Sequence, residues 1–288
     1  MTAGDHRDRP GTEGAPEPGD GPVRPVTLST SSAYPLNCPD AFALAARLGF
    51  DGVEVLVWHD PVSQDDAALA ALARYHEVPV LSVHAPTLLL ARGVWDGDPG
   101  DKLRRSCEMA AALGAGVVVT HPPFRWERHY AEVFTATIAD LEREFSLIIA
   151  VENMFPWGVG RRRARAHLPD WDPTGQVWPH VTLDLSHAAT AGQNGLDLAE
   201  RLGDRLVHLH LGDGNGSFRD EHLVPGDGLQ PCDAVLRLLA ERNWAGRVVV
   251  EVNTRRMDPA RREGALVRSL AFARWHLSEP SARSRQTP

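Results

Sequence analysis

The 288-residue chain has a formal net charge of −8, 43% hydrophobic residues and three cysteines. This composition allows an ordinary buried core, disfavours a broadly basic nucleic-acid footprint and, without a CxxC pair, gives no sign of a zinc ribbon or redox dithiol. No stretch approaches the roughly 18 consecutive apolar residues of a membrane span, and no apolar signal segment opens the chain, so we expect a reduced, cytoplasmic protein with no membrane partner.

The two ends of the chain differ in composition from its middle. Residues 1–24 are dominated by Gly, Pro and charged residues, which predicts a disordered tail. Residues 277–288 are similar, and we expect a flexible C-terminal tail there. The remaining residues, 25–276, come close to the usual length of a single (β/α)8 barrel.

Between the tails, short apolar runs alternate with longer amphipathic segments. Eight runs are predicted as strands: Val26–Thr30, Gly52–Trp58, Val78–His84, Gly116–His121, Leu147–Glu152, Val181–Asp184, Leu206–Leu211 and Val248–Val252. Six segments are predicted as helices: Asp40–Leu48, Asp65–His76, Asp101–Leu113, Glu127–Phe145, Asp233–Arg242 and Pro259–His276. Such alternation is typical of parallel strands joined by crossover helices.

Two places depart from the regular pattern. Met154–Pro179 is rich in Arg, Pro and Trp, so we expect an elaborated loop with at most a short helix, and the helix after Asp184 is also expected to be short. An open doubly wound sheet is the competing architecture. Because no GxGxxG follows the first strand and no Walker-type glycine loop occurs, we predict an α/β fold with one closed (β/α)8 TIM barrel.

Chemically active residues gather at the predicted strand ends, where barrel enzymes place their sites. Six successive strands contribute His84, His121, Glu152, Asp184 with His187, His210 and Glu251. Any one of these alone would ordinarily be a hydrogen-bonded structural residue. Together they would crowd several carboxylates on one rim, which is costly without a compensating cation. We therefore expect a divalent metal site.

The Gly-rich stretch His208–Gly228 adds two further ligand candidates to this rim. One four-ligand centre would comprise Glu152, Asp184, His210 and Glu251. A second ion would be held by His84, His121 and a shared Glu152, and a third by His187, Asp220 and His222. Imidazole and carboxylate ligands without thiolates suit Zn²⁺, Mn²⁺, Co²⁺ or Fe²⁺, so one to three such ions are expected.

Several strings carry a family resemblance: LGFDGVEV, SVHAP, VENM, LDLSHAATAG, HLHLGDG, PGDG and VVVEVN. They resemble the xylose-isomerase-like barrel superfamily, especially its sugar phosphate isomerase/epimerase branch, over about residues 26–276. The resemblance implies a metal that binds two neighbouring oxygens of a small sugar or sugar phosphate and acidifies the C–H between them. Glu152 and Glu251, on opposite sides of the substrate, would then remove and return the proton.

The chain also resembles endonuclease IV, a member of the same superfamily. All nine zinc-ligand positions of that enzyme are matched, by His84, His121, Glu152, Asp184, His187, His210, Asp220, His222 and Glu251. This resemblance implies a trinuclear zinc phosphodiesterase acting on abasic-site DNA or another phosphoester, with nucleic acid as a partner only in that case. Yet the stretches after Thr30 and Trp58 are too short for its DNA-recognition loops. The Arg161–Arg165 run could contact phosphates or simply form a solvated loop.

Two further residues, His208 and Asp213, lie close in sequence to the ligand candidate His210. If His210 points toward the rim, we expect strand alternation to turn His208 away and into core packing. Asp213 is as readily a turn or supporting residue as a ligand. A barrel that only binds its ligand is disfavoured because a complete ligand shell suggests chemistry. The preferred hypothesis is a metal-dependent sugar isomerase or epimerase, ahead of the phosphodiesterase, with substrate and oligomeric state left open.

Overall fold

Eight parallel strands close into a barrel in the computed structural model, which describes residues 24–88, 91, 93–159 and 162–278. The strands are β1 (Val26–Ser29), β2 (Val53–Leu56), β3 (Val80–His84), β4 (Val117–Thr120), β5 (Ile148–Glu152), β8 (Val181–Asp184), β9 (Leu206–Leu211) and β10 (Arg247–Val250). Each pairs in parallel with both of its neighbours, and β1 meets β10 to close the ring. The predicted (β/α)8 barrel is confirmed, and the open doubly wound sheet is excluded.

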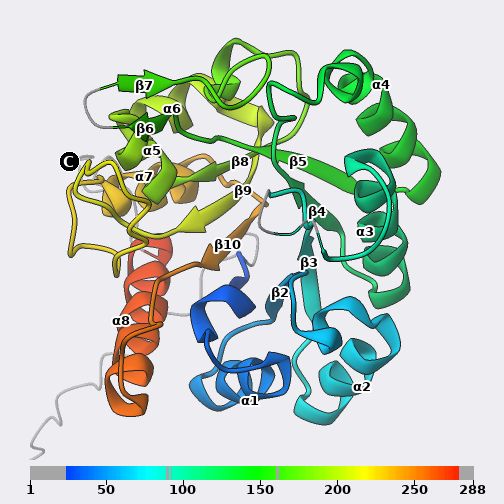
Figure 1. Cartoon of the computed structure of the whole chain (residues 1–288). Helices are drawn as coiled ribbons and strands as arrows, with labels where there is room; N and C mark the ends of the chain where they lie inside the picture. The colour runs from blue at the N-terminus through cyan, green and yellow to red at the C-terminus, as the bar shows by residue number, and fades with distance from the viewer. Residues whose placement is uncertain (1–23, 89–90, 92, 160–161, 279–288) are drawn as a thin grey trace, which may run out of the picture.

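The helices surround these strands as an outer ring (Figure 1). They are α1 (Cys38–Leu48), α2 (Asp66–His76), α3 (Pro99–Leu113), α4 (Arg128–Phe145), α5 (Leu185–Ala191), α6 (Gly195–Leu202), α7 (Cys232–Glu241) and α8 (Pro259–Ser278). α1 shows how the sequence sets such bounds, because the Asn37 side chain accepts a hydrogen bond from the Asp40 amide and Gly49 ends the helix with a φ of 80°. Among the described residues, no helix is both long and apolar enough to cross a membrane.

Both predicted tails fall almost entirely outside the described residues, at 1–23 and 279–288. The described part of the chain ends with α8 at Ser278, and the side chain of Leu277 is 9% exposed. The last helix therefore continues two residues beyond the limit expected for the barrel.

The segment Met154–Pro179 holds more regular structure than predicted. It forms an antiparallel ribbon of β6 (Trp157–Val159) and β7 (Arg162–Ala164), followed by a 3-10 turn at Pro173–Gly175. The prediction of a loop with at most a short helix is wrong here, because two three-residue strands leave too few positions for a visible alternation. After β8, two short helices, α5 and α6, replace the single short helix expected.

The barrel interior is partly polar. The larger apolar cluster includes Val118 of β4, whereas Val117, Val119 and Ala150 form a separate small cluster, as alternation along the strands requires. Other strand residues that are fully buried carry polar side chains: Thr27, Glu54, Ser82, Thr182, His208 and His210. Buried polar groups of this kind need hydrogen-bond partners.

Candidate active site

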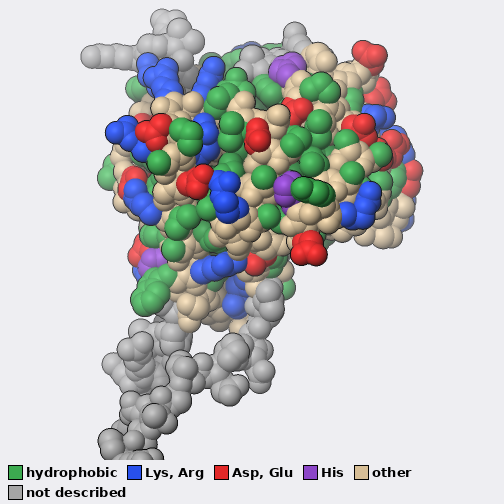
Figure 2. All heavy atoms as spheres, turned by 90° about the horizontal axis from the view of Figure 1, so that it is seen from below, with side chains coloured by type: hydrophobic (Ala, Val, Ile, Leu, Met, Phe, Trp, Pro, Cys, Tyr) green, Lys and Arg blue, Asp and Glu red, His purple; other side chains and the backbone are tan. Residues whose placement is uncertain are grey.

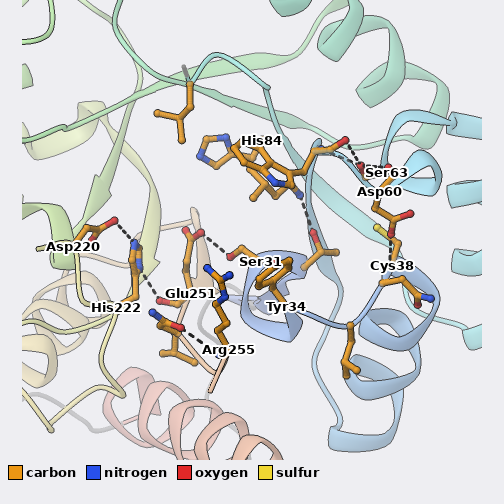
Figure 3. Close-up of a pocket in the computed structure, with 18 of the residues that line it drawn as sticks. Ser31, Tyr34, Cys38, Asp60, Ser63, His84, Asp220, His222, Glu251 and Arg255 are labelled. Carbon is orange, nitrogen blue, oxygen red and sulfur yellow. Dashed lines mark hydrogen bonds and ion pairs between the residues drawn. The ribbon is translucent and has the colours of Figure 1, made fainter. Parts of the chain in front are cut away.

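All nine predicted ligand residues converge on one connected network at the carboxyl ends of the strands. Seven of them line a cavity of about 670 Å³: His84, His121, Glu152, His187, Asp220, His222 and Glu251. Asp184 and His210 are fully buried beside it. Figure 3 shows His84, Glu251, His222 and Asp220 around this cavity, which they reach from different strands and loops.

Glu152, at the end of β5, lies at the centre of the network. Its Oε2 is 3.2 Å from His84 Nε2 and 3.1 Å from His121 Nε2, while its Oε1 is 3.0 Å from His210 Nδ1 and 3.3 Å from His187 Nδ1. Burial alone would raise the pKa of Glu152, but the positive charge of His210 and His187 and the hydrogen bonds of its neighbours hold it well below its usual range. The carboxylate is therefore ionised within a ring of imidazoles.

The Asp184-x-x-His187 spacing is explained by a helix start. Asp184 caps α5, and its Oδ1 accepts a 2.7 Å hydrogen bond from the His187 amide, which places both side chains on one side of the first turn. Asn153, directly after Glu152, fixes this turn by accepting from the Asp184 amide at 2.6 Å and donating to its carbonyl at 3.0 Å. The remaining oxygen, Asp184 Oδ2, is buried and has no hydrogen-bond partner among the residues that the structure describes.

Three carboxylate oxygens surround His210 Nδ1. Besides Glu152 Oε1, Glu251 Oε2 lies 2.9 Å from this nitrogen and Asp184 Oδ2 lies 3.6 Å from it. Ser31 holds Glu251 in place by donating a 2.8 Å hydrogen bond to Oε1. Three carboxylate oxygens around one imidazole nitrogen, one of them otherwise unpartnered, fit the donor set of a divalent cation.

A second cluster adjoins the first. Asp220 Oδ2 lies 2.9 Å from His222 Nε2 and 3.3 Å from His187 Nε2. Burial would lower the pKa of His187, but the charges of Asp184, Asp220 and Glu152 raise it to about 10. Asp184 Oδ2 is also 4.0 Å from His222 Nδ1, so Asp184 joins the two clusters.

In each of the five histidines of the network, one ring nitrogen faces a carboxylate of the cluster and the other contacts a further protein group; for His187 this second nitrogen, Nδ1, also lies 3.3 Å from Glu152 Oε1. The outer contacts are His84 Nδ1 to the Ala85 carbonyl, His121 Nδ1 to Thr87 Oγ1, His187 Nδ1 to the Asn153 carbonyl, His222 Nδ1 to the Glu251 carbonyl, and His210 Nε2 to Glu54. Metal-binding histidines are commonly oriented through their second nitrogen in this way.

Asp213 organises the loop that carries Asp220 and His222. Its buried carboxylate accepts hydrogen bonds from the amides of Gly214 and Gln230 at Oδ1 and of Gly226 and Gly228 at Oδ2. A Cβ at Gly228 would clash with this carboxylate, which explains the second glycine of the GDG motif. Of the two roles open for Asp213, the structure therefore shows the supporting one.

The sequence as a whole matches the xylose isomerase-like TIM barrel family over residues 42–275. The chain belongs to this family. It is 49% identical over 276 residues to an uncharacterised protein of Mycobacterium leprae, a match that covers 89% of this chain and 99% of the relative. Fructoselysine 3-epimerase of Escherichia coli O157:H7 is 22% identical over 245 residues, 77% of this chain and 87% of that enzyme.

Among solved structures, the structure of this chain is similar to that of the IOLI protein with a bound zinc atom. The TM-score is 0.63 and the sequence identity 18%, over 88% of this chain and 98% of the other. At this identity the likeness concerns the fold.

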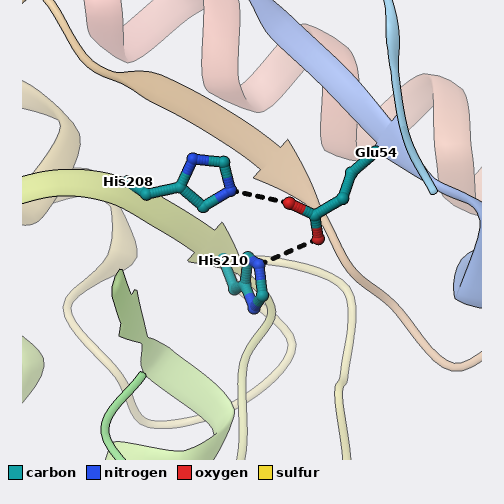
Figure 4. Close-up of side chains that lie close together, drawn as sticks. All are labelled: Glu54, His208 and His210. Atoms are coloured by element: carbon teal, nitrogen blue, oxygen red, sulfur yellow. Dashed lines mark hydrogen bonds and ion pairs between the residues drawn. The ribbon is translucent and has the colours of Figure 1, made fainter. Parts of the chain in front are cut away.

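The structure differs from the sequence-based expectations at two residues, His208 and Glu54. His208 and His210 both contact Glu54 of β2, so they point to the same side of β9 (Figure 4). The expectation that alternation separates them is wrong, because residues two apart on a strand share a face. Glu54 itself was missed, although an acidic residue between Val53 and Val55 in a buried strand is a signal that it has buried partners.

The cavity lining also includes residues that do not belong to the nine-residue network. Tyr34 and Arg255 are two of these, with the guanidinium carbon 5.1 Å from the centre of the tyrosine ring. Arg255 is the one Lys or Arg among the described residues that line the cavity. In Figure 3 it rises beside Ser31 and Glu251.

Among the arginines of the Arg161–Arg165 run, the structure describes the side chain of Arg165. Arg161 and the side chains of Arg162 and Arg163 lie outside the described residues. The guanidinium of Arg165 is 3.3 Å from Asp170 Oδ2 and contacts the Trp171 ring, so it is engaged locally. The two alternatives for this run, a phosphate contact and a solvated loop, both stay open.

Proposed function

We propose that the protein is a divalent-metal-dependent isomerase or epimerase of a small sugar or sugar phosphate. One observation carries the proposal: two carboxylates that line the cavity, Glu152 at the end of β5 and Glu251 directly after β10, meet at a single imidazole nitrogen of the buried His210. The relationship to fructoselysine 3-epimerase supports an epimerase. The likeness to a zinc-bound barrel of the same fold supports a metal.

Glu152, Asp184, His210 and Glu251 would hold the ion. Their nitrogen and oxygen donors, without thiolate, suit Zn²⁺, Mn²⁺ or Co²⁺. A bound ion of this kind would act as a Lewis acid that polarises a substrate carbonyl and its neighbouring hydroxyl and so acidifies the carbon between them.

Glu152 and Glu251 are placed to move the proton. In the barrel order β8 and β9 separate β5 from β10, so the two carboxylates approach the cavity floor from different sides. Burial would raise the pKa of Glu251, but the positive charge of His210 and its hydrogen bond lower it to about 2, so the group is ionised. One carboxylate would take the proton from the substrate carbon and the other would return one to its opposite face.

Solvent deuterium tests this assignment. Wild-type protein with added Mn²⁺, Co²⁺ or Zn²⁺ is incubated in D₂O with a panel of ketoses and ketose phosphates, and mass spectrometry follows deuterium at the carbon beside the carbonyl. We expect exchange into at least one of these sugars, and we expect Glu251→Gln to abolish it while circular dichroism stays native. Undiminished exchange in a folded Glu251→Gln protein would refute the assignment.

The second cluster supports another candidate function, a trinuclear zinc phosphodiesterase. His187, Asp220 and His222 form a compact donor group that a one-metal epimerase does not require. Against it, the chain has a formal net charge of −8, and on the one face shown in Figure 2 the Lys and Arg side chains are interspersed with Asp and Glu. Cleavage of a duplex containing an abasic site by protein loaded with three zinc ions would favour this candidate, and one bound metal without cleavage would count against it.

A further inference from the structure

Glu54 lies outside the cavity but contacts the centre of the network from within the barrel. Its carboxylate is fully buried, and Oε2 accepts a 2.8 Å hydrogen bond from Ser82 Oγ and lies 2.8 Å from His208 Nε2. Its other oxygen, Oε1, is 3.0 Å from His210 Nε2. Figure 4 shows the carboxylate between the two histidine rings.

Oε1 and His210 Nε2 lie 3.0 Å apart, at ion-pair distance. Both atoms are buried, and neither has a conventional hydrogen-bond partner among the described residues. Ser82 and His208 occupy Oε2, so the position of Oε1 is fixed relative to β9. A buried carboxylate oxygen with one imidazole in front of it favours a proton on that nitrogen.

His210 differs in this respect from the other four histidines of the network. Those four contact a carbonyl or a hydroxyl through Nδ1 and direct Nε2 toward a carboxylate of the network, although His187 Nδ1 also lies 3.3 Å from Glu152 Oε1. His210 alone has a carboxylate behind it and turns Nδ1 inward, toward Glu152 and Glu251. A carboxylate behind a ligand histidine fixes the ring and makes its inner nitrogen a stronger donor.

We propose that Glu54 is a positioning residue for the metal centre: it keeps the His210 proton on Nε2 and presents Nδ1 to the ion. The inference rests on the proposed metal-dependent function, and it extends that function to a residue of β2 that touches neither substrate nor metal. His208, 2.8 Å from Oε2, is sufficient to hold the Glu54 carboxylate in place without Ser82.

Metal affinity measured without any sugar tests the inference. Zn²⁺ binding to the full chain is titrated against a chromophoric chelator for wild type, Glu54→Gln and the control Ser82→Ala. The control removes one hydrogen bond to Glu54 but leaves the negative charge of Glu54 unchanged. Groups that hold the second ring nitrogen of a metal-binding histidine commonly contribute 10- to 100-fold to metal affinity. We therefore expect Glu54→Gln to bind Zn²⁺ about 10- to 100-fold more weakly. Ser82→Ala should stay within about threefold of wild type, since Glu54 and His210 remain in contact.

The outcomes separate this inference from the proposed function. Wild-type protein that binds no Zn²⁺ would overturn both. Wild-type binding with unchanged affinity in Glu54→Gln, or an equal loss in Ser82→Ala, would overturn the role of Glu54 alone.

A second measurement uses wild-type protein, so it tests the proposed role of Glu54 even if Glu54→Gln does not fold. In Zn²⁺-loaded wild-type protein with ¹⁵N-labelled histidine, NMR should show His210 carrying a slowly exchanging proton on Nε2 and bound to the ion through Nδ1. A Zn²⁺-bound Nε2 on His210 would overturn the proposal.

Discussion

Replacing Asp213 with Asn tests how the loop carrying Asp220 and His222 is held. The carboxylate accepts four backbone amides, two at each oxygen, with N–O distances of 2.7–3.0 Å. An asparagine keeps one oxygen for two of these amides and turns an NH₂ group toward the other two. Two hydrogen bonds to a charged acceptor are therefore lost, at about 1.5–3 kcal/mol each, or about 3–6 kcal/mol in all.

The assay is thermal unfolding beside a control in the same loop. At roughly 2–4 °C per kcal/mol for a domain of this size, even the lower value predicts that Asp213→Asn lowers Tm by about 6–12 °C. Asp227→Asn removes the same charge from an exposed pair with Arg268, 2.5 Å apart, and should cost less than about 1 kcal/mol. If the two variants melt within about 2 °C of each other, the assigned role of Asp213 is refuted.

Three further predictions concern the cavity and the core. Ser31→Ala removes the 2.8 Å hydrogen bond to Glu251 and should lower kcat about 10-fold with little change in KM; an unchanged kcat would argue against Glu251 as the proton-transfer group. Arg255→Met should raise KM about 10-fold for a phosphorylated substrate but not for a neutral sugar, and equal effects in steady-state assays would exclude Arg255 as a phosphate contact. Phe42→Ala, at a fully buried core position, should lower the free energy of unfolding by about 3–5 kcal/mol in urea titrations, whereas a loss below about 1 kcal/mol would contradict its core assignment.

The barrel and its rim could be predicted from the sequence because two local signals agree. Apolar runs such as Val117–Thr120 alternate with capped helices, and the polar residue that follows a run, such as His121, must lie at the carboxyl end of a parallel strand. Since all carboxyl ends meet on one rim, residues far apart in the chain, such as Glu152 and Glu251, could be placed together without knowing any contact.

What the sequence did not reveal depends on register and on contacts within the barrel. Glu54 lies before the end of β2, so the strand-end argument did not include it, and only the pairing of β2 with β3 places it beside Ser82. The ribbon of β6 and β7 is set by tertiary pairing of two three-residue strands rather than by an alternating pattern. The role of Asp213 required knowing that the amide of Gln230, 17 residues away, returns to its carboxylate.

Metal content of the protein purified without added metal tests the central claim most directly. Elemental analysis should find about one divalent transition-metal ion per chain, and Asp184→Asn, which alters the otherwise unpartnered oxygen beside His210, should remove most of it. A protein that retains no metal and binds none when it is supplied would contradict the proposed chemistry. Three zinc ions per chain would instead favour the phosphodiesterase.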